Sequence, residues 1–83
     1  MSNNGITPIE QYVIDAVREK RIEKGLSQRE LAYLLDLSPS FIGDIESPKS
    51  IAKYNLNHIN KLAEILECSP RDFLPEKFIN AKV

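Results

Sequence analysis

The sequence has little of what metal sites and phosphate-binding loops usually need. Its 83 residues include three glycines, one cysteine and one histidine. Glycine is too scarce for a glycine-rich phosphate loop, and neither G-x-G-x-x-G nor G-K-[ST] occurs. Cys68 has no second cysteine for a disulfide, and together with His58 it falls short of a usual zinc site. We therefore expect no metal, no cofactor and no oxidising compartment.

Long hydrophobic runs are also missing. No run of apolar residues approaches the ~20 needed to cross a bilayer. The first five residues, Met-Ser-Asn-Asn-Gly, offer neither the basic region nor the apolar core of a secretion signal. We expect a cytoplasmic protein with no membrane partner. With 42% hydrophobic and 28% charged residues, the composition is that of one small globular domain.

A basic excess is absent as well. Eleven Lys and Arg residues stand against twelve Asp and Glu residues, for a formal net charge of −1 at pH 7. Between Glu30 and Pro48 the chain has acidic residues and no basic one, whereas the segments on either side have more Lys and Arg than Asp and Glu. Any binding of a polyanion must therefore depend on positive charge that is arranged locally.

What the sequence does have is a series of helix starts. Thr7-Pro8-Ile9-Glu10 and Ser27-Gln28-Arg29-Glu30 are capping boxes, in which a hydroxyl accepts from a helical amide and a glutamate accepts from the cap amide. Further starts are predicted at Ser38-Pro39, at Asn55 or Asn57, and at Ser69-Pro70-Arg71-Asp72. Apolar residues recur at steps of three and four after these starts, so we expect an all-α fold of five helices.

The same pattern sets the expected boundaries. We expect a flexible N-terminus over residues 1–6, one domain over 7–75 and a C-terminal tail over 76–83. Gly25 is placed to end the first helix in the left-handed conformation. The tail carries Phe78, Ile79 and Val83, which either pack on the first helix or contact a second copy of the chain.

The centre of the chain predicts two short helices joined by a tight turn. The second helix, about residues 28–35, is separated by Asp36-Leu37 from the third, about residues 38–47. Helices joined so closely must cross at a steep angle, with the small Ala32 near the crossing. The second helix of such a pair projects outward and can enter the major groove of DNA.

These residues resemble the helix-turn-helix domains of phage repressors of the Cro/CI type (Xre-like). The resemblance is carried by Gly-Leu-Ser-Gln-x-Glu-Leu-Ala at residues 25–32, by Ile-x-x-Ile-Glu at 42–46 and by residues 62–74. It extends over about residues 10–75 and implies a five-helix, lambda-repressor-like DNA-binding domain with a central helix-turn-helix. It also implies a sequence-specific transcriptional regulator, with repression as the expected effect. The expected partners are double-stranded DNA and a second copy in a homodimer, with no small-molecule ligand.

The resemblance also implies roles for particular residues. Arg21 and Glu46 match a pair that forms a structural salt bridge in some members of the family. Base-reading positions correspond to Ser38, Pro39, Ser40, Phe41 and Asp44. Phosphate-contacting positions correspond to Gln28, Lys49, Lys53, Tyr54, Asn55 and Asn57, to which we add Arg29 for its charge.

The predicted recognition helix is acidic. It lacks the Arg, Asn and Gln side chains that make bidentate contacts with bases, and phosphate would repel Asp44. Gly43 in mid-helix costs about 1 kcal/mol relative to alanine, which indicates either a close backbone approach or a crowded position. An alternative interpretation is therefore a protein-interaction module or antitoxin-like adaptor of the same fold, with weak or no DNA reading.

No residue pattern favours catalysis. A nucleophile paired with a base is not recognisable, so we do not expect an enzyme. His58 is expected to be a partly buried packing residue on the fourth helix, and Cys68 to be an inert buried thiol.

Overall fold

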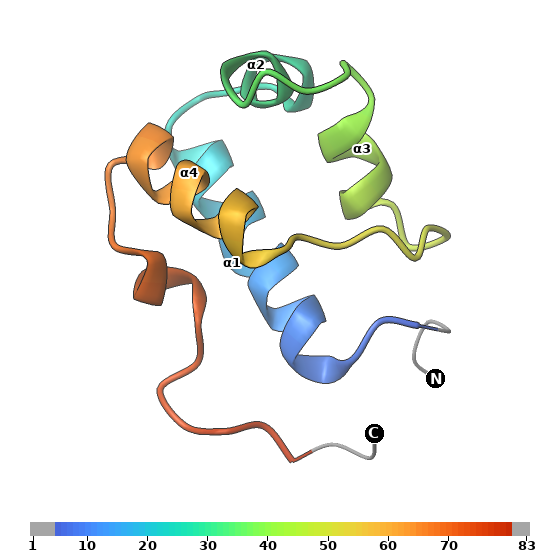
Figure 1. Cartoon of the computed structure of the whole chain (residues 1–83), viewed down its shortest axis with the longest axis vertical. Helices are drawn as coiled ribbons and strands as arrows, with labels where there is room; N and C mark the ends of the chain where they lie inside the picture. The colour runs from blue at the N-terminus through green and yellow to red at the C-terminus, as the bar shows by residue number, and fades with distance from the viewer. Residues whose placement is uncertain (1–4, 81–83) are drawn as a thin grey trace.

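The structure, a computed structural model, describes residues 5–80 of the chain. This part consists of the helices α1 (Pro8–Glu23), α2 (Gln28–Leu34), α3 (Phe41–Glu46) and α4 (Leu56–Leu66), followed by a short 3₁₀ helix, η1 (Pro70–Phe73). The fold class is therefore all-α, as predicted, but the fifth element is a single 3₁₀ turn and not an α-helix. Figure 1 shows α2 at the top of the molecule, α3 along the right side and the tail along the left, with α1 and α4 in the middle.

The predicted helix starts are mostly confirmed. Thr7, Ser27 and Ser69 each cap a helix with a complete capping box, and Asn55 is the cap of α4. The Asn55 box is closed by His58, whose Nδ1 accepts from the backbone N–H of Asn55 at 3.0 Å. His58 is half-buried, so it is a capping residue as well as a packing residue.

Three helices end in the same kind of turn. Leu26 N–H donates to Arg21 O, Leu37 N–H to Ala32 O and Cys68 N–H to Ala63 O, at 3.1, 3.0 and 2.9 Å. This pattern needs one left-handed residue after each helix. Gly25 adopts that conformation after α1, as predicted, whereas Asp36 (φ 61°) and Glu67 (φ 59°) adopt it after α2 and α4. The last two are unfavourable for residues with a Cβ, and the sequence analysis did not anticipate them.

The hydrophobic core lies where the four α-helices and η1 meet. Its fully buried side chains come from every helix and from η1, namely Val17, Leu31, Ile42, Leu62, Leu66 and Phe73. A smaller cluster is formed by Ile6, Ile14 and Ile45. Ile6, which lies just before the predicted start of the domain at residue 7, is buried in this cluster. Residues 1–4 lie outside the described part of the chain.

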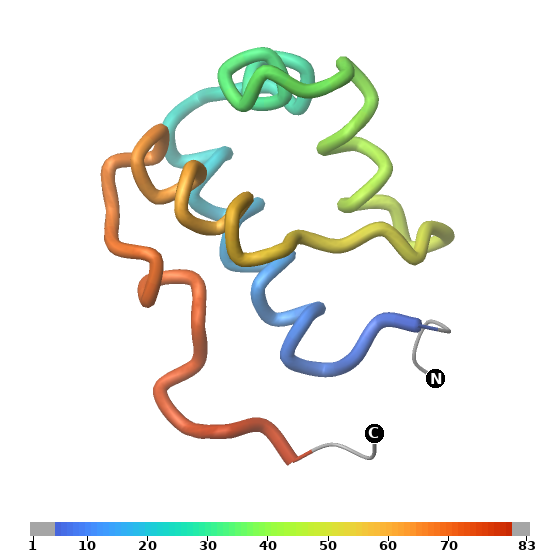
Figure 2. The backbone as a smooth tube through the Cα atoms, viewed as in Figure 1, coloured from blue at the N-terminus to red at the C-terminus, as the bar shows by residue number. Residues whose placement is uncertain are grey.

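The tail leaves the domain after η1 without forming a helix. Figure 2 shows it turning beneath the domain, on the side where α1 begins. Phe78 is 90% exposed and Ile79 is half-buried, while Val83 lies outside the described residues. Among residues 5–80, no helix is both long and apolar enough to cross a membrane.

Candidate nucleic-acid interface

The α2–α3 pair projects a short helix from the surface of the domain. Ala32 of α2 and Ile42 and Ile45 of α3 are buried, which fixes the inner face of the pair. The turn at Asp36 and Leu37 changes the direction of the chain within a few residues. The outer face is left to Ser38, Pro39, Ser40 and Asp44, all of which are exposed.

The start of α3 differs from the prediction. The sequence analysis placed it at Ser38 with Pro39 as the first helical residue, but the helix spans only Phe41–Glu46. Ser38 O accepts from Phe41 N–H at 3.0 Å, so residues 38–41 form a turn that leads into the helix. Ser40 occupies the cap position with helical backbone angles and no side-chain cap bond. Within the described residues, the hydroxyls of Ser38 and Ser40 are therefore not used by the fold.

Phe41 points inward, although it was predicted among the base-reading residues. Its ring lies 5.0 Å from that of His58, edge to face, and 6.3 Å from that of Tyr54. These contacts attach the start of α3 to the segment that leads into α4 and to α4 itself. Aromatic pairs at such distances favour edge-to-face geometry, which fixes the orientation of the rings. Phe41 is half-buried and packs against both hydrophobic clusters.

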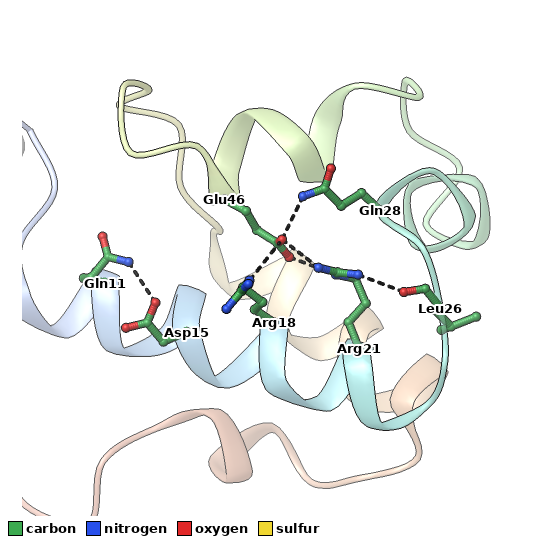
Figure 3. Close-up of polar contacts among 7 residues, drawn as sticks. All are labelled: Gln11, Asp15, Arg18, Arg21, Leu26, Gln28 and Glu46. Atoms are coloured by element: carbon green, nitrogen blue, oxygen red, sulfur yellow. Dashed lines mark hydrogen bonds and ion pairs between the residues drawn. The ribbon is translucent and has the colours of Figure 1, made fainter.

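The end of α3 is held by a buried carboxylate. Glu46 has a side chain only 4% exposed, and it accepts from Arg21 Nε at 3.0 Å and Arg21 Nη2 at 2.9 Å. Gln28 Nε2 donates to the same carboxylate at 2.9 Å, and Arg18 Nε lies 3.8 Å away. Arg21 also donates to Leu26 O at 2.8 Å, so one cluster joins α1, the start of α2 and the end of α3 (Figure 3). Bidentate pairing of this kind fixes geometry as well as charge.

Gly43 faces the side chain of Gln28. A Cβ on Gly43 would lie 3.1 Å from Gln28 Oε1, which is closer than ordinary van der Waals contact. The sequence analysis offered a close backbone approach or a crowded position as the reason for this glycine, and the structure shows a crowded position. Gln28 thus supports α3 through its hydrogen bond to Glu46 and occupies the space beside Gly43.

The candidate phosphate contacts fall into two groups. Arg29, Lys49 and Asn57 are exposed, and their side chains have no partner among the described residues. Lys53, Asn55 and Gln28 have intramolecular partners, and Tyr54 is considered below. Lys53 Nζ donates to Gly5 O at 2.9 Å and lies 3.2 Å from Glu10 Oε2, and Asn55 Oδ1 accepts from His58 N–H at 2.8 Å. Gln28 is held by Glu46, as described above.

Burial changes the pKa values of two further side chains, those of Tyr54 and Cys68. Burial, with a smaller contribution from the Glu46 charge, raises the pKa of Tyr54 well above its usual value, so its hydroxyl stays protonated. That hydroxyl is buried without a hydrogen-bond partner in the described structure, so it is not placed to meet a phosphate. Burial also raises the pKa of Cys68, as expected for an unreactive thiol. Among the described residues, no cluster of His, Cys, Asp and Glu could hold a metal ion.

Comparison with known proteins points to one family. The model of a protein family described as helix-turn-helix matches residues 17–73. A crystal structure of a hypothetical transcription factor, NHTF, from Neisseria is similar with a TM-score of 0.68 at 27% identity, covering 83% of this chain and 82% of that one. The restriction-modification controller protein C.AhdI from Aeromonas hydrophila is similar with a TM-score of 0.65 at 36% identity, covering 76% of this chain and 92% of that one. A search of curated proteins finds no match. The chain therefore belongs to the helix-turn-helix family of Cro/CI-type DNA-binding transcriptional regulators, with α2 and α3 as the two helices of the motif.

Proposed function

We propose that this chain is a sequence-specific repressor that acts as a homodimer on double-stranded DNA in the cytoplasm. In this proposal, four α-helices and η1 together correspond to the five elements of the lambda-repressor-like plan. Helix α3 enters the major groove, and the chain carries out no chemistry of its own. The names of the similar structures, a transcription factor and a controller protein, support a regulatory role.

One observation carries the proposal. Ser38, Pro39 and Ser40 are exposed on the turn that leads into α3, and Asp44 is exposed on α3 itself, while the inner side of the helix is held by buried apolar residues and by Glu46. Serine hydroxyls can donate to or accept from base edges, and proline can pack against a thymine methyl group. Asp44 can accept from the amino group of cytosine. Phe41 is left out of this reading surface because its ring packs inward.

The acidity of the α2–α3 region is smaller at the surface than the sequence suggests. Glu46 is buried and paired with Arg21, and Glu30 accepts from the cap amide of Ser27 at 2.7 Å. Asp36 and Asp44 are the acids of this region that remain exposed without a partner in the described residues. Arg29 and Lys49 are free to approach phosphates, and we assign them the main role in positioning the domain.

The test is selection of bound sequences from a random double-stranded DNA pool at near-physiological salt. We expect enrichment of an inverted repeat with half-sites about 10–10.5 base pairs apart. Replacing Ser40 with alanine should change the preferred base at one position of each half-site, whereas Lys49→Ala should weaken binding to all sequences alike. Failure to enrich any sequence would contradict sequence-specific reading.

A second candidate is a protein-interaction module or antitoxin-like adaptor of the same fold. The observation in its favour is that α3 carries no Arg, Lys, Asn or Gln and presents Asp44 outward. This candidate predicts only weak retention on DNA, equal for all sequences and lost as salt increases. The selection experiment therefore separates the two.

Dimerisation is tested by light scattering at micromolar concentration with and without a duplex that contains the selected site. We expect two chains on each inverted repeat. A single chain in both conditions would contradict the homodimer.

A further inference from the structure

An apolar groove of about 380 Å³ opens where α1, α4 and the start of the tail meet. Most of its lining is apolar and comes from three separate parts of the chain, namely Ile9, Val13, Tyr54, Leu56, Ile59 and Leu74. Leu56 is 83% exposed, and Ile9 and Leu74 are both more than 40% exposed. Large apolar side chains gathered in this way on a small domain mark a surface that is covered by another molecule.

The tail carries the complementary feature. Phe78 follows Leu74 by four residues and is 90% exposed, so it is not seated in its own groove. Leu74 has extended backbone angles and Pro75 follows it, so the chain leaves the domain at the rim of the groove. The half-buried Ile79 keeps this part of the tail near the domain while Phe78 is presented to solvent.

We propose that the groove receives Phe78 from a second copy of this chain, so that two chains exchange tails across a two-fold axis. The proposal deepens the homodimer of the proposed function by naming its contact surface. One chain carries both the aromatic side chain and the groove, close together. If two chains are related by a two-fold axis, the Phe78 side chain of each chain enters the groove of the other. Both grooves are then filled by the same contact, as in isologous dimers. An unrelated partner would leave Phe78 exposed.

The charges around the groove permit two copies to meet. Glu10 in the groove wall is paired with Lys53, at 3.2 Å between Oε2 and Nζ. On the tail, Glu76 and Lys77 are adjacent and cancel each other. The surfaces brought together therefore carry no excess of one sign, so association does not bring like charges together.

The groove is separate from the residues proposed to read bases. Its wall includes Tyr54 and Asn55, two of the predicted phosphate-contacting residues, but none of the residues proposed to read bases. The domain measures 34 × 27 × 21 Å, and recognition helices of a dimer are separated by one turn of DNA, about 34 Å. A domain of this size is large enough for two copies, joined at the groove, to reach successive major grooves on one face of the duplex.

The first test is sedimentation equilibrium of the full chain without DNA from ~1 μM to ~1 mM. We expect a reversible dimer, weakened about tenfold or more by Phe78→Ala and by Leu56→Asp, because each variant alters both symmetric contacts. Leu56→Asp is expected to fold, since the residue is exposed in the first turn of α4, where a carboxylate is favourable. Asn60→Asp, with the same charge change on the exposed side of α4, should leave the dissociation constant within about twofold.

The second test asks whether Phe78 and the groove meet each other. A mixed pair of one Leu56→Asp chain and one Phe78→Ala chain places both defects in one contact and leaves the other contact intact. If the two side chains meet, the defects are not additive. The mixed pair should then associate about fivefold or more tightly than the geometric mean of the two variant homodimers, beyond the statistical factor of two. Sedimentation velocity with one variant labelled at its amino terminus measures this.

Three results would overturn the tail exchange: a chain that stays monomeric throughout the range, a Leu56→Asp effect no larger than that of Asn60→Asp, or a mixed pair equal to the geometric mean. DNA selection is run on the same preparations. A monomer that still enriches a half-site would overturn the tail exchange and leave the proposed DNA reading in place. A dimer that enriches no sequence would contradict the proposed DNA reading and leave the tail exchange in place.

Discussion

Glu46 lies at the end of α3 with almost no solvent exposure, between Arg21 of α1 and Gln28 of α2. Its charge is compensated by a bidentate guanidinium and by an amide donor. Removing one member of a buried pair leaves the other charge without a partner, and this costs far more than the net contribution of the pair. The orientation of α3 therefore depends on a side chain that is not among the proposed base-reading residues.

We predict that Glu46→Ala lowers the free energy of unfolding by about 3–5 kcal/mol, because it leaves the buried Arg21 guanidinium unpaired. Urea denaturation measures the change. Glu64→Ala removes an exposed pair with Lys61 and should cost less than about 1 kcal/mol. Similar losses for both variants would show that the Glu46 cluster has no special structural role.

Asp36 offers a gain in stability. Its φ of 61° is unfavourable for a side chain with a Cβ, and a carboxylate at the end of a helix also opposes the helix dipole. We predict that Asp36→Gly raises the free energy of unfolding by about 0.5–1 kcal/mol, seen as an increase of a few degrees in Tm. Asp36→Ala removes the carboxylate but keeps the backbone strain, so it should stabilise less than Asp36→Gly. Equal Tm values for the two variants would argue against backbone strain at this turn.

At the scale of whole elements, α4 begins with a capping box that depends on the protonation of His58. Its Nδ1 accepts from Asn55 N–H, which requires the neutral ring. Burial lowers the pKa of His58 below its ordinary value of about 6.5. Between the lowered and the ordinary pKa the unfolded chain binds more protons than the folded chain, so the free energy of unfolding rises with pH in this range.

We accordingly predict that stability is greatest above pH 6.5 and declines as the pH falls towards 5. Thermal denaturation across this range measures the effect. His58→Gln can still accept at the cap but does not titrate, so its profile should be flatter. His58 is the one histidine of the chain, and the carboxylates of Glu10 and Glu30, whose pKa values are lowered by backbone hydrogen bonds, act at lower pH. A wild-type profile as flat as that of the variant would contradict this role.

The helix starts could be predicted because their signals are local. A cap hydroxyl and a glutamate three residues later form both bonds within one turn, so Thr7 and Ser27 needed no tertiary information. The start of α3 could not be predicted in this way. Ser38-Pro39 matches the sequence pattern of a helix start. In the structure, however, residues 38–41 form a separate turn between the left-handed residue Asp36 and the helix.

Long-range contacts explain what the sequence missed in the candidate site. Lys53 meets Glu10 across 43 residues, and Phe41 meets His58 on another helix. Neither contact leaves a periodic or capping signal. The Arg21–Glu46 pair was expected only through the family resemblance. The two residues are far apart in the sequence, and no local sequence pattern predicts that they meet.

For the whole molecule, the sparse positive charge determines how DNA affinity should depend on salt. Under the proposed function, each phosphate neutralised contributes about 0.9 to the slope of log K against log salt. We predict that Lys49→Ala lowers the magnitude of this slope by about 0.9, the contribution of one phosphate contact. The Lys49 side chain is exposed and unpaired in the described structure. Lys53→Ala should lower it less, since Lys53 is already paired with Glu10.

Binding of each variant to the selected duplex, measured over a series of salt concentrations, gives the slopes. Lys61→Ala serves as a control because its partner is Glu64 on the same helix, away from α3 in sequence. An equal decrease for Lys49→Ala and Lys53→Ala would mean that Lys53 leaves Glu10 when DNA binds.

The Glu46 cluster has a consequence for how binding preference can change. The residues that hold α3 in place, Arg21, Gln28 and Glu46, are separate from those proposed to face the bases, Ser38, Pro39, Ser40 and Asp44. Mutations in the second set alter exposed side chains that make no hydrogen bond or ion pair within the described residues. The DNA sequence that such a domain prefers can therefore change through mutations at these few exposed positions while the domain stays folded. The same separation makes the domain a suitable scaffold for libraries of variants with altered specificity.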